Sequence, residues 1–225
     1  YKSNFAKAES LLVEALEVER RVHDASSVSY GELLRGLASV LVDLNRPAEA
    51  DSVIDESITV LRKAVGSTHP SYLRSVYMAA ELRYGRGDLK RTIDLTEEVV
   101  AQIGATLPDA TPVAAQALSL LGQARDSLGD YAAADSLIRR AITLRKKYLP
   151  ADHWIHASTD GAWATHLSRV GREAEAERLL LQSYEQLVAS RGADAYPTKV
   201  MARRLGDLMT RLRRPEDAAR WRAKG

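Results

Sequence analysis

Residues 8–12, Ala8-Glu9-Ser10-Leu11-Leu12, contain a short pattern that returns along the chain every 42 residues. A small residue followed by an apolar residue three positions later appears at each step. The small residues are Ala8, Ala50, Thr92, Ala134, Ala176 and Ala218. These positions, which we call the late file, keep their register without an insertion. A fixed period of this length is the sequence signature of a repeat architecture.

A second set of small residues lies twelve positions before the last five members of the late file. We call it the early file, and it consists of Ala38, Ala80, Gly122, Ala164 and Gly206. Two helices can cross closely only where neither presents a bulky side chain. The two files therefore predict a close helix crossing in every repeat, between one early and one late position.

The residues around both files are apolar at helical spacing. In one repeat the apolar positions are Leu34, Leu37, Leu41 and Leu44, then Val53, Ile54, Ile58 and Leu61. Such spacing is typical of amphipathic helices, so each repeat holds two. The breaks between the helices of a pair contain Gly or Pro: Asn45-Arg46-Pro47, Gly87-Asp88, Gly129-Asp130, Gly171-Arg172 and Arg214-Pro215.

These observations predict an all-α chain with one domain over residues 1–225. An orphan helix at 3–23 comes first, and helix pairs follow at about 28–65, 70–103, 112–148, 153–190 and 197–224. Within the pairs we expect helices at 28–44 and 47–65, 70–86 and 88–103, 112–128 and 130–148, 153–170 and 172–190, and 197–212 and 215–224. HEAT and armadillo arrays have similar periods, but armadillo units need three helices and only two fit here.

The chain resembles tetratricopeptide repeats of the 42-residue type found in kinesin light chains and many bacterial proteins. The resemblance covers essentially all 225 residues and rests on the pairs Leu37-Ala38, Leu121-Gly122, Trp163-Ala164 and Leu205-Gly206, with the late file. It implies a right-handed α–α superhelix, a solenoid of about five and a half helix pairs, whose concave face binds a protein or peptide.

The resemblance does not extend to the family's peptide-contacting residues. Kinesin light chains carry asparagines early in the first helix of each pair. The corresponding positions here are Arg35-Gly36, Tyr77-Met78, Ser119-Leu120, Gly161-Ala162 and Arg203-Arg204. The Lys and Asn residues that hold a C-terminal carboxylate in chaperone-binding members are also missing. The partner specificity of these relatives is therefore not transferred to this chain.

In such an array the first helix of each pair lines the inner surface. Polar residues around the early file are therefore the expected partner contacts, and Tyr and Arg are enriched at binding hot spots. The candidates are Arg35, Ser39, Arg74, Tyr77, Glu81, Tyr84, Gln116, Gln123, Arg203 and Asp207. A scaffold that binds a protein or peptide on this face is the function that the sequence favours.

An alternative is a sensory, regulatory or self-association segment of a larger signalling protein. Arrays of this type often follow the kinase domain and membrane helix of bacterial Ser/Thr kinases. The sequence begins with Tyr1 inside a helical pattern, so we expect it to be a piece of a longer chain. The orphan first helix also predicts a homodimer formed through the ends of the array, since solenoid ends need polar caps.

Composition argues against several other functions. The net charge of +2 is too small to favour nucleic acid or a membrane surface, and the absence of cysteine excludes disulfides and thiolate chemistry. No apolar stretch approaches the roughly 20 residues of a membrane span. Residues 203–224 hold eight basic and three acidic residues without an aromatic platform, which we interpret as a solvated outer face. We expect Trp221, in the apolar column of Leu11 and Leu179, to pack inward.

Catalytic and metal-binding patterns are incomplete in this sequence. His153, His156 and Asp160 have a spacing that could place three ligands on one helix face, but further ligands of the usual kind are missing. The stretch Gly85-Arg86-Gly87 lacks the strand and lysine of a phosphate loop. Glu97 and Glu98 are neighbours along a helix and do not face each other. We expect no enzyme activity, no metal and no cofactor.

Overall fold

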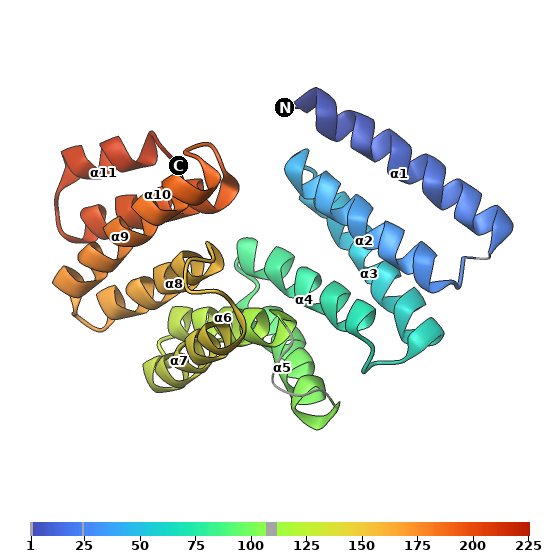
Figure 1. Cartoon of the computed structure of the whole chain (residues 1–225), viewed down its shortest axis with the longest axis horizontal. Coiled ribbons are helices and arrows are strands. Elements are labelled where there is room, and N and C mark those ends of the chain that lie inside the picture. Colours follow the sequence, from blue (N-terminus) through green and yellow to red (C-terminus); the bar gives the residue numbers. More distant parts are fainter. Residues whose placement is uncertain (1, 24, 107–111) are drawn as a thin grey trace. The chain divides into compact units, whose positions relative to one another are not determined.

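The computed structural model describes residues 2–23, 25–106 and 112–225, and all the regular secondary structure in them is helical (Figure 1). The described residues form eleven helices, which agrees with an orphan helix followed by five pairs. Clustering of contacts divides the chain into two compact units, residues 1–117 and 118–225. We describe each unit by itself.

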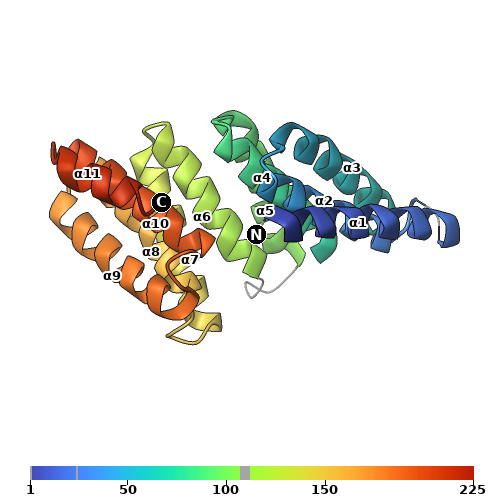
Figure 2. The same ribbon diagram turned by 90° about the horizontal axis from the view of Figure 1, so that it is seen from above.

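Unit 1 consists of helices that each pack on the next one along the chain. They are α1 (Lys2–Val22), α2 (Val28–Asp43), α3 (Pro47–Val65), α4 (Pro70–Gly85) and α5 (Leu89–Thr106), followed by the start of α6 (Pro112–Ser127). Consecutive helices such as α2 and α3 lie side by side in opposite directions, and α2 also contacts α4 (Figures 1 and 2). The first helices of neighbouring pairs are therefore adjacent, as the repeat predicts.

Unit 2 continues the same pattern from the second half of α6. Its further helices are α7 (Tyr131–Tyr148), α8 (Ile155–Arg169), α9 (Glu173–Arg191), α10 (Tyr196–Arg211) and α11 (Pro215–Arg222). Helix α8 begins at Ile155, two residues later than predicted, because His153 takes part in a turn: its Nδ1 accepts a hydrogen bond from the Ile155 amide at 3.3 Å. Helix α11 ends at Arg222 rather than at residue 224.

The two files of small residues meet as predicted. The Thr92 hydroxyl lies 3.5 Å from the Ala80 carbonyl oxygen, twelve residues earlier. A methyl group added at Gly122 would lie 3.4 Å from the Ala134 carbonyl oxygen, with the side chain of Ile138 closer still, at 2.6 Å. The early and late files therefore mark the points of closest approach between the two helices of a pair.

The turn inside each helix pair has one backbone geometry that recurs every 42 residues. The second residue after the first helix has a positive φ, and the amide of the following residue donates to a carbonyl five residues back at 2.9–3.0 Å. This is the helix-ending arrangement in which a left-handed residue lets the chain reverse and satisfies a helix carbonyl. The left-handed positions are Asn45, Gly87, Gly129, Gly171 and Arg213.

The core lies between the helices of each pair. Leu180, Leu187 and Leu205 are fully buried in unit 2. Trp221 packs against this cluster and meets the ring of Tyr184 edge-on, with the ring centres 4.9 Å apart. The inward packing predicted for Trp221 is confirmed, and this aromatic pair completes the last helix pair of the chain.

Candidate partner-binding faces

In each unit, the first helices of neighbouring pairs pack beside each other: α2 with α4 in unit 1, and α8 with α10 in unit 2. We call the surfaces that these helices form the α2/α4 face and the α8/α10 face. The predicted contact residues of α2 and α4 and those of α10 can be placed on these two surfaces, one unit at a time.

The α2/α4 face carries a small network of charged and hydroxyl groups. The Ser71 hydroxyl donates to Glu32 Oε1 at 2.6 Å, and Arg74 Nη2 lies 3.4 Å from the same oxygen. Tyr77 donates through its hydroxyl to Glu81 Oε1 at 2.7 Å, along the same helix. Acidic and basic groups are therefore interleaved on this face, and each cation there has an acid close by.

Arg35 is the most constrained of the predicted residues in unit 1. It is half-buried, and its Nε is buried without a hydrogen-bond partner. Burial, and then the charge of Arg74, lowers the pKa of the Arg35 guanidinium. The structure thus brings Arg35 and Arg74 together across α2 and α4. Glu32 acts in the opposite direction on the pKa of Arg35, and its carboxylate lies 3.4 Å from Arg74, so one anion already lies near both cations.

The other predicted residues of unit 1 lie further from this network. Ser39 is exposed on α2, Tyr84 is half-buried near the end of α4, and Gln116 is half-buried on α6. No hydrogen bond between described residues joins Ser39 or Tyr84 to Arg35, Arg74 or Glu32. Their role in binding a partner stays a prediction.

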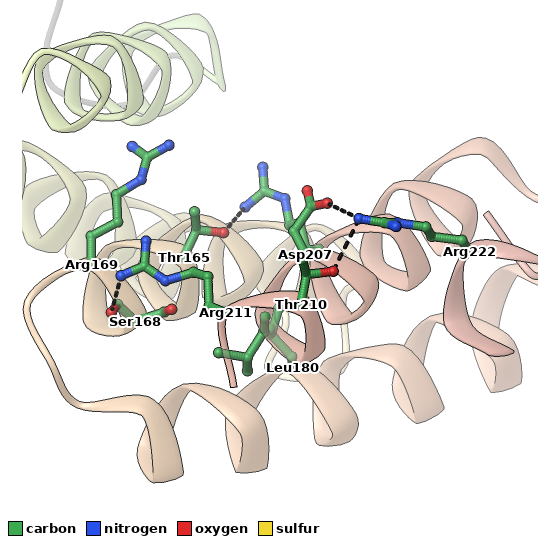
Figure 3. Close-up of a pocket in the computed structure, with 10 residues that line it drawn as sticks. Thr165, Ser168, Arg169, Leu180, Asp207, Thr210, Arg211 and Arg222 are labelled. Atoms are coloured by element: carbon green, nitrogen blue, oxygen red, sulfur yellow. Dashed lines mark hydrogen bonds and ion pairs between the residues drawn. The ribbon is translucent and has the colours of Figure 1, made fainter. Parts of the chain in front are cut away.

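The α8/α10 face contains a hollow of about 270 Å³ that is rich in arginine (Figure 3). Its walls come from α8, α9, α10 and α11. The lining residues are Thr165, Ser168, Arg169, Leu180, Arg204, Asp207, Leu208, Thr210, Arg211 and Arg222. One carboxylate and four guanidinium groups line the same space, so the hollow has a positive electrostatic character.

Three of these arginines are held in place from different helices. Arg169 Nη1 lies 2.6 Å from Asp126 Oδ2, and Arg211 Nη2 donates to the Ser168 carbonyl oxygen at 3.1 Å. Arg222 Nη2 donates to the Thr210 hydroxyl at 3.0 Å (Figure 3). Because each guanidinium has five N–H donors, these bonds fix its position and leave other donors available.

Arg204 links α10 to two other helices. Its Nη1 lies 3.4 Å from the Thr165 hydroxyl on α8, and its Nη2 donates to Gln123 Oε1 on α6 at 2.7 Å. Gln123 is two repeats away, so one side chain spans the α8/α10 face. Among the sequence candidates, Asp207 lines the hollow and Gln123 contacts it through Arg204. Arg203 packs beside Gly225, and its neighbour Arg204 lines the hollow.

A buried hydrogen-bonded pair lies next to Arg169, one of the residues that line the hollow. His166 Nδ1 is 2.8 Å from Asp126 Oδ1, and both side chains are almost wholly buried. The imidazole also stacks on Trp163, with ring centres 5.1 Å apart. Asp126 therefore joins His166 and Arg169 of α8 to α6, and it fixes one wall of the hollow.

Two buried side-chain polar atoms of the described residues have no hydrogen-bond partner, and each lies on one of the two faces. They are Arg35 Nε on α2 and Ser168 Oγ on α8. Buried polar atoms are almost always hydrogen-bonded, so each exception calls for an explanation. A ligand that supplies the missing partner is one such explanation.

The three residues with a metal-ligand spacing, His153, His156 and Asp160, have other surroundings in the structure. His153 interacts with the Ile155 amide, and His156 Nε2 lies 3.0 Å from the Pro150 carbonyl oxygen. Burial raises the pKa of Asp160, which lies beside Trp163 in a separate hollow between α7, α8 and α9. No group of three potential metal ligands comes together within the described part of the chain. None of its helices is long and apolar enough to cross a membrane.

Comparison with known proteins identifies the repeat. Models of the tetratricopeptide repeat match residues 32–71 and 115–148. A search of curated proteins found no match.

Solved structures extend the similarity along the chain. Nearly identical kinesin light chain TPR-like repeats from Podosopora anserina superpose with a TM-score of 0.66 at 22% identity, covering 85% of this chain and 91% of that one. BtubC (BKLC) from P. vanneervenii superposes with a TM-score of 0.69 at 12% identity, covering 96% of this chain and 87% of that one. A Rap protein complexed with competence and sporulation factor superposes with a TM-score of 0.70 at 13% identity, covering 99% of this chain and 69% of that one. The chain therefore contains tetratricopeptide repeats, and its fold is that of the kinesin-light-chain-like repeat proteins.

Proposed function

We propose that the chain is a scaffold that binds a partner protein or peptide on the α2/α4 and α8/α10 faces. The fold itself supports an interaction role, because the repeat proteins it resembles are scaffolds of this kind. One similar protein, the Rap protein, is complexed with the competence and sporulation factor. The contacts proposed here are the ten sequence candidates, together with Arg204 and Arg211.

A single observation carries this proposal. The two buried polar atoms without a partner, Arg35 Nε and Ser168 Oγ, both lie where first helices of neighbouring pairs meet. A protein that used these surfaces only for packing would gain stability by replacing such groups with apolar ones. Their retention is explained if a partner supplies the missing hydrogen bonds.

The proposal includes the absence of catalysis. Acid, base and nucleophile must converge on a substrate-sized pocket for most enzymatic reactions. The arginine-lined hollow offers positive charge and hydroxyl groups, and its lining carboxylate, Asp207, is exposed and lies 3.9 Å from Arg222. This arrangement is suited to holding an anionic group rather than to transforming one.

The test is quantitative affinity capture with the whole chain as bait. Charge reversal of Arg35 and Arg74 together, or alanine at Tyr77 and Tyr84 together, should reduce capture of specific partners at least tenfold. Each variant removes groups of the hot-spot type from the α2/α4 face. Lys63→Glu, on the exposed side of α3, is the matched control, since it changes charge away from both faces.

The variants must retain the helical circular dichroism and melting temperature of the wild type. Undiminished capture by the Arg35 and Arg74 variant, or an equal loss with Lys63→Glu, would show that the α2/α4 face is not the binding surface.

Self-association with a second copy is the other candidate, as expected for a regulatory segment of a larger signalling protein. Helix α1 carries large apolar side chains that are more than half exposed: Leu11 at 55%, Val18 at 53% and Val22 at 65%. Leu95, which occupies the repeat position of Leu11, is only 8% exposed. Light scattering should show a dimer that Leu11→Glu disrupts, and a strict monomer at high concentration would contradict this candidate.

A further inference from the structure

We infer that the arginine-lined hollow of the α8/α10 face receives an anionic side chain of the bound partner, either a carboxylate or a phosphate group. This inference rests on the proposed function and adds a chemical preference to it. It follows from the charge of the hollow, the fixed positions of its arginines and the buried hydroxyl of Ser168.

The charge balance of the hollow favours an anion. Arg169, Arg204, Arg211 and Arg222 line it, and Asp207 is the lining carboxylate. Even when the buried Asp126 is counted against Arg169, four guanidinium groups face two carboxylates. No carboxylate in the described part of the chain forms an ion pair with Arg211. A guest with one or two negative charges would therefore neutralise the site.

The arginines are arranged in advance of binding. Arg211 is held by the Ser168 carbonyl, Arg222 by Thr210, and Arg169 by Asp126. Figure 3 shows these side chains approaching the same space from α8, α10 and α11. Guanidinium forks that are already fixed lose little conformational entropy when they bind an oxyanion. Fixed donors that surround a small space also select a compact anionic group over an extended apolar one.

Ser168 gives independent support, because it does not depend on the count of charges. The residue is 4% exposed and lines the hollow, yet its Oγ has no hydrogen-bond partner among the described residues. A buried hydroxyl that is left unpaired loses the hydrogen bonds that it would make to water. An anionic oxygen bound between Arg211 and Ser168 would accept the hydrogen bond that this hydroxyl can donate.

The size of the hollow limits the guest. A volume of about 270 Å³ is at the lower end of small-molecule sites, which span about 300–1,000 Å³. It accommodates one side chain, whereas a whole helix would need a long groove. We therefore place a single Glu, Asp or phosphorylated Ser or Thr of an otherwise extended partner segment in the hollow.

The experiment uses the whole chain labelled with ¹⁵N and three blocked tripeptides, Gly-Ser-Gly, Gly-Glu-Gly and Gly-phosphoSer-Gly. Backbone amides of residues 165–169 and 204–211 are followed during titration. At least one anionic peptide should shift these signals in a saturable way, and the neutral peptide should not. A response to phosphoserine alone, to glutamate alone, or to both identifies the source of the anion, and each supports the inference.

Matched variants locate the binding site. Arg211→Gln should weaken the anionic peptide about tenfold, because a charge-assisted hydrogen bond contributes about 1.5 kcal/mol or more. Ser168→Ala should weaken it about threefold. Arg220→Gln removes the same charge from α11, which also borders the hollow, but Arg220 does not line the hollow, so the affinity should change less than twofold.

The inference is wrong if the hollow's signals do not respond to either anionic peptide, if the neutral peptide shifts them equally, or if Arg220→Gln and Arg211→Gln weaken binding to the same degree. Such a failure is separable from failure of the proposed function. Partner capture is tested with variants of the α2/α4 face in the other unit and does not depend on an anion in the hollow.

Discussion

The α2/α4 face and the α8/α10 face have the same place in their repeats but different chemistry. On the α2/α4 face, Glu32 and Arg74 form an exposed pair, with side chains 40% and 47% exposed. In unit 2, Arg169 of the α8/α10 face pairs with Asp126 of the preceding first helix, α6, and the Asp126 side chain is only 2% exposed. The α2/α4 face has an exposed, balanced ion pair, whereas the α8/α10 face has an excess of arginine and is anchored through a buried carboxylate of α6. The shared scaffold therefore leaves the choice of ligand charge to a few side chains.

The largest expected effect tests this difference in burial. Asp126→Ala leaves His166 and Arg169 without their acid, and breaking a buried pair in this way destabilises by about 3–5 kcal/mol. The corresponding change in unit 1, Glu32→Ala, should cost less than about 1 kcal/mol because its pair is exposed. Native-state hydrogen exchange should show the larger loss of protection in α8. Equal losses in α2 and α8 would mean that the two links contribute alike.

The next effect concerns the early file, which is alanine in unit 1 but includes two glycines in unit 2. A methyl group at Gly122 would lie 2.6 Å from Ile138 Cγ1, so Gly122→Ala should destabilise by about 1–2 kcal/mol despite the better helix propensity of alanine.

Ala80→Gly is the matched change in unit 1, and it should cost about 1–2 kcal/mol, because it lowers helix propensity and removes a fully buried methyl group. Urea unfolding measures both. A gain of stability in Gly122→Ala would show that α6 and α7 leave room for a methyl group at Gly122.

A smaller effect, of opposite sign, tests the unpaired polar atoms. Ser168→Ala should raise the free energy of unfolding by about 1 kcal/mol, because it removes a buried unpaired hydroxyl and improves helix propensity. Arg35→Met should stabilise unit 1 by less, since Arg35 is only half-buried. Thermal unfolding compares the two, with Ser39→Ala as the exposed control. Destabilisation by Ser168→Ala would show that its hydroxyl is already satisfied.

The smallest effect lies in the turns. Arg213 in unit 2 has a φ of 57°, and Asn45 in unit 1 has a φ of 61° at the same repeat position. Asparagine tolerates the left-handed region better than arginine does. Arg213→Gly should therefore raise stability by about 0.5 kcal/mol, and Asn45→Gly should have almost no effect. Calorimetry of both variants measures these changes in stability. A larger gain in stability for Asn45→Gly than for Arg213→Gly would contradict the prediction.

Much of the fold was predictable because it depends on periodic properties. The 42-residue period placed every helix boundary to within three residues, and the largest difference is the end of α5, which lies at Thr106 rather than at residue 103. The small residues at Ala80, Thr92 and Gly122 marked the close crossings, since a helix crossing requires small side chains whatever the rest of the sequence is. The inward packing of Trp221 was predictable in the same way, because it occupies the apolar repeat position of Leu11 and Leu179.

The arginine-lined hollow was not predictable, because it depends on contacts between repeats. Sequence spacing favoured Arg203, whereas the structure directs its neighbour Arg204 across α8 to Gln123. The basic residues after position 203 were interpreted as a solvated face, yet Arg204, Arg211 and Arg222 line the hollow. Side-chain torsions and the distance between helices decide such contacts, and neither is periodic. The buried pair of Asp126 and His166 is hidden from sequence for the same reason.

The recurring turn has a consequence for building new proteins from this one. Each first helix is followed by a residue in the left-handed backbone conformation and by the same amide-to-carbonyl bond. Both features recur every 42 residues. A chain cut after Gly87 and rejoined after Gly129 would meet a backbone of matching conformation. Whole repeats could thus be duplicated, deleted or exchanged at these glycines, so that binding surfaces of chosen charge are assembled in a chosen order.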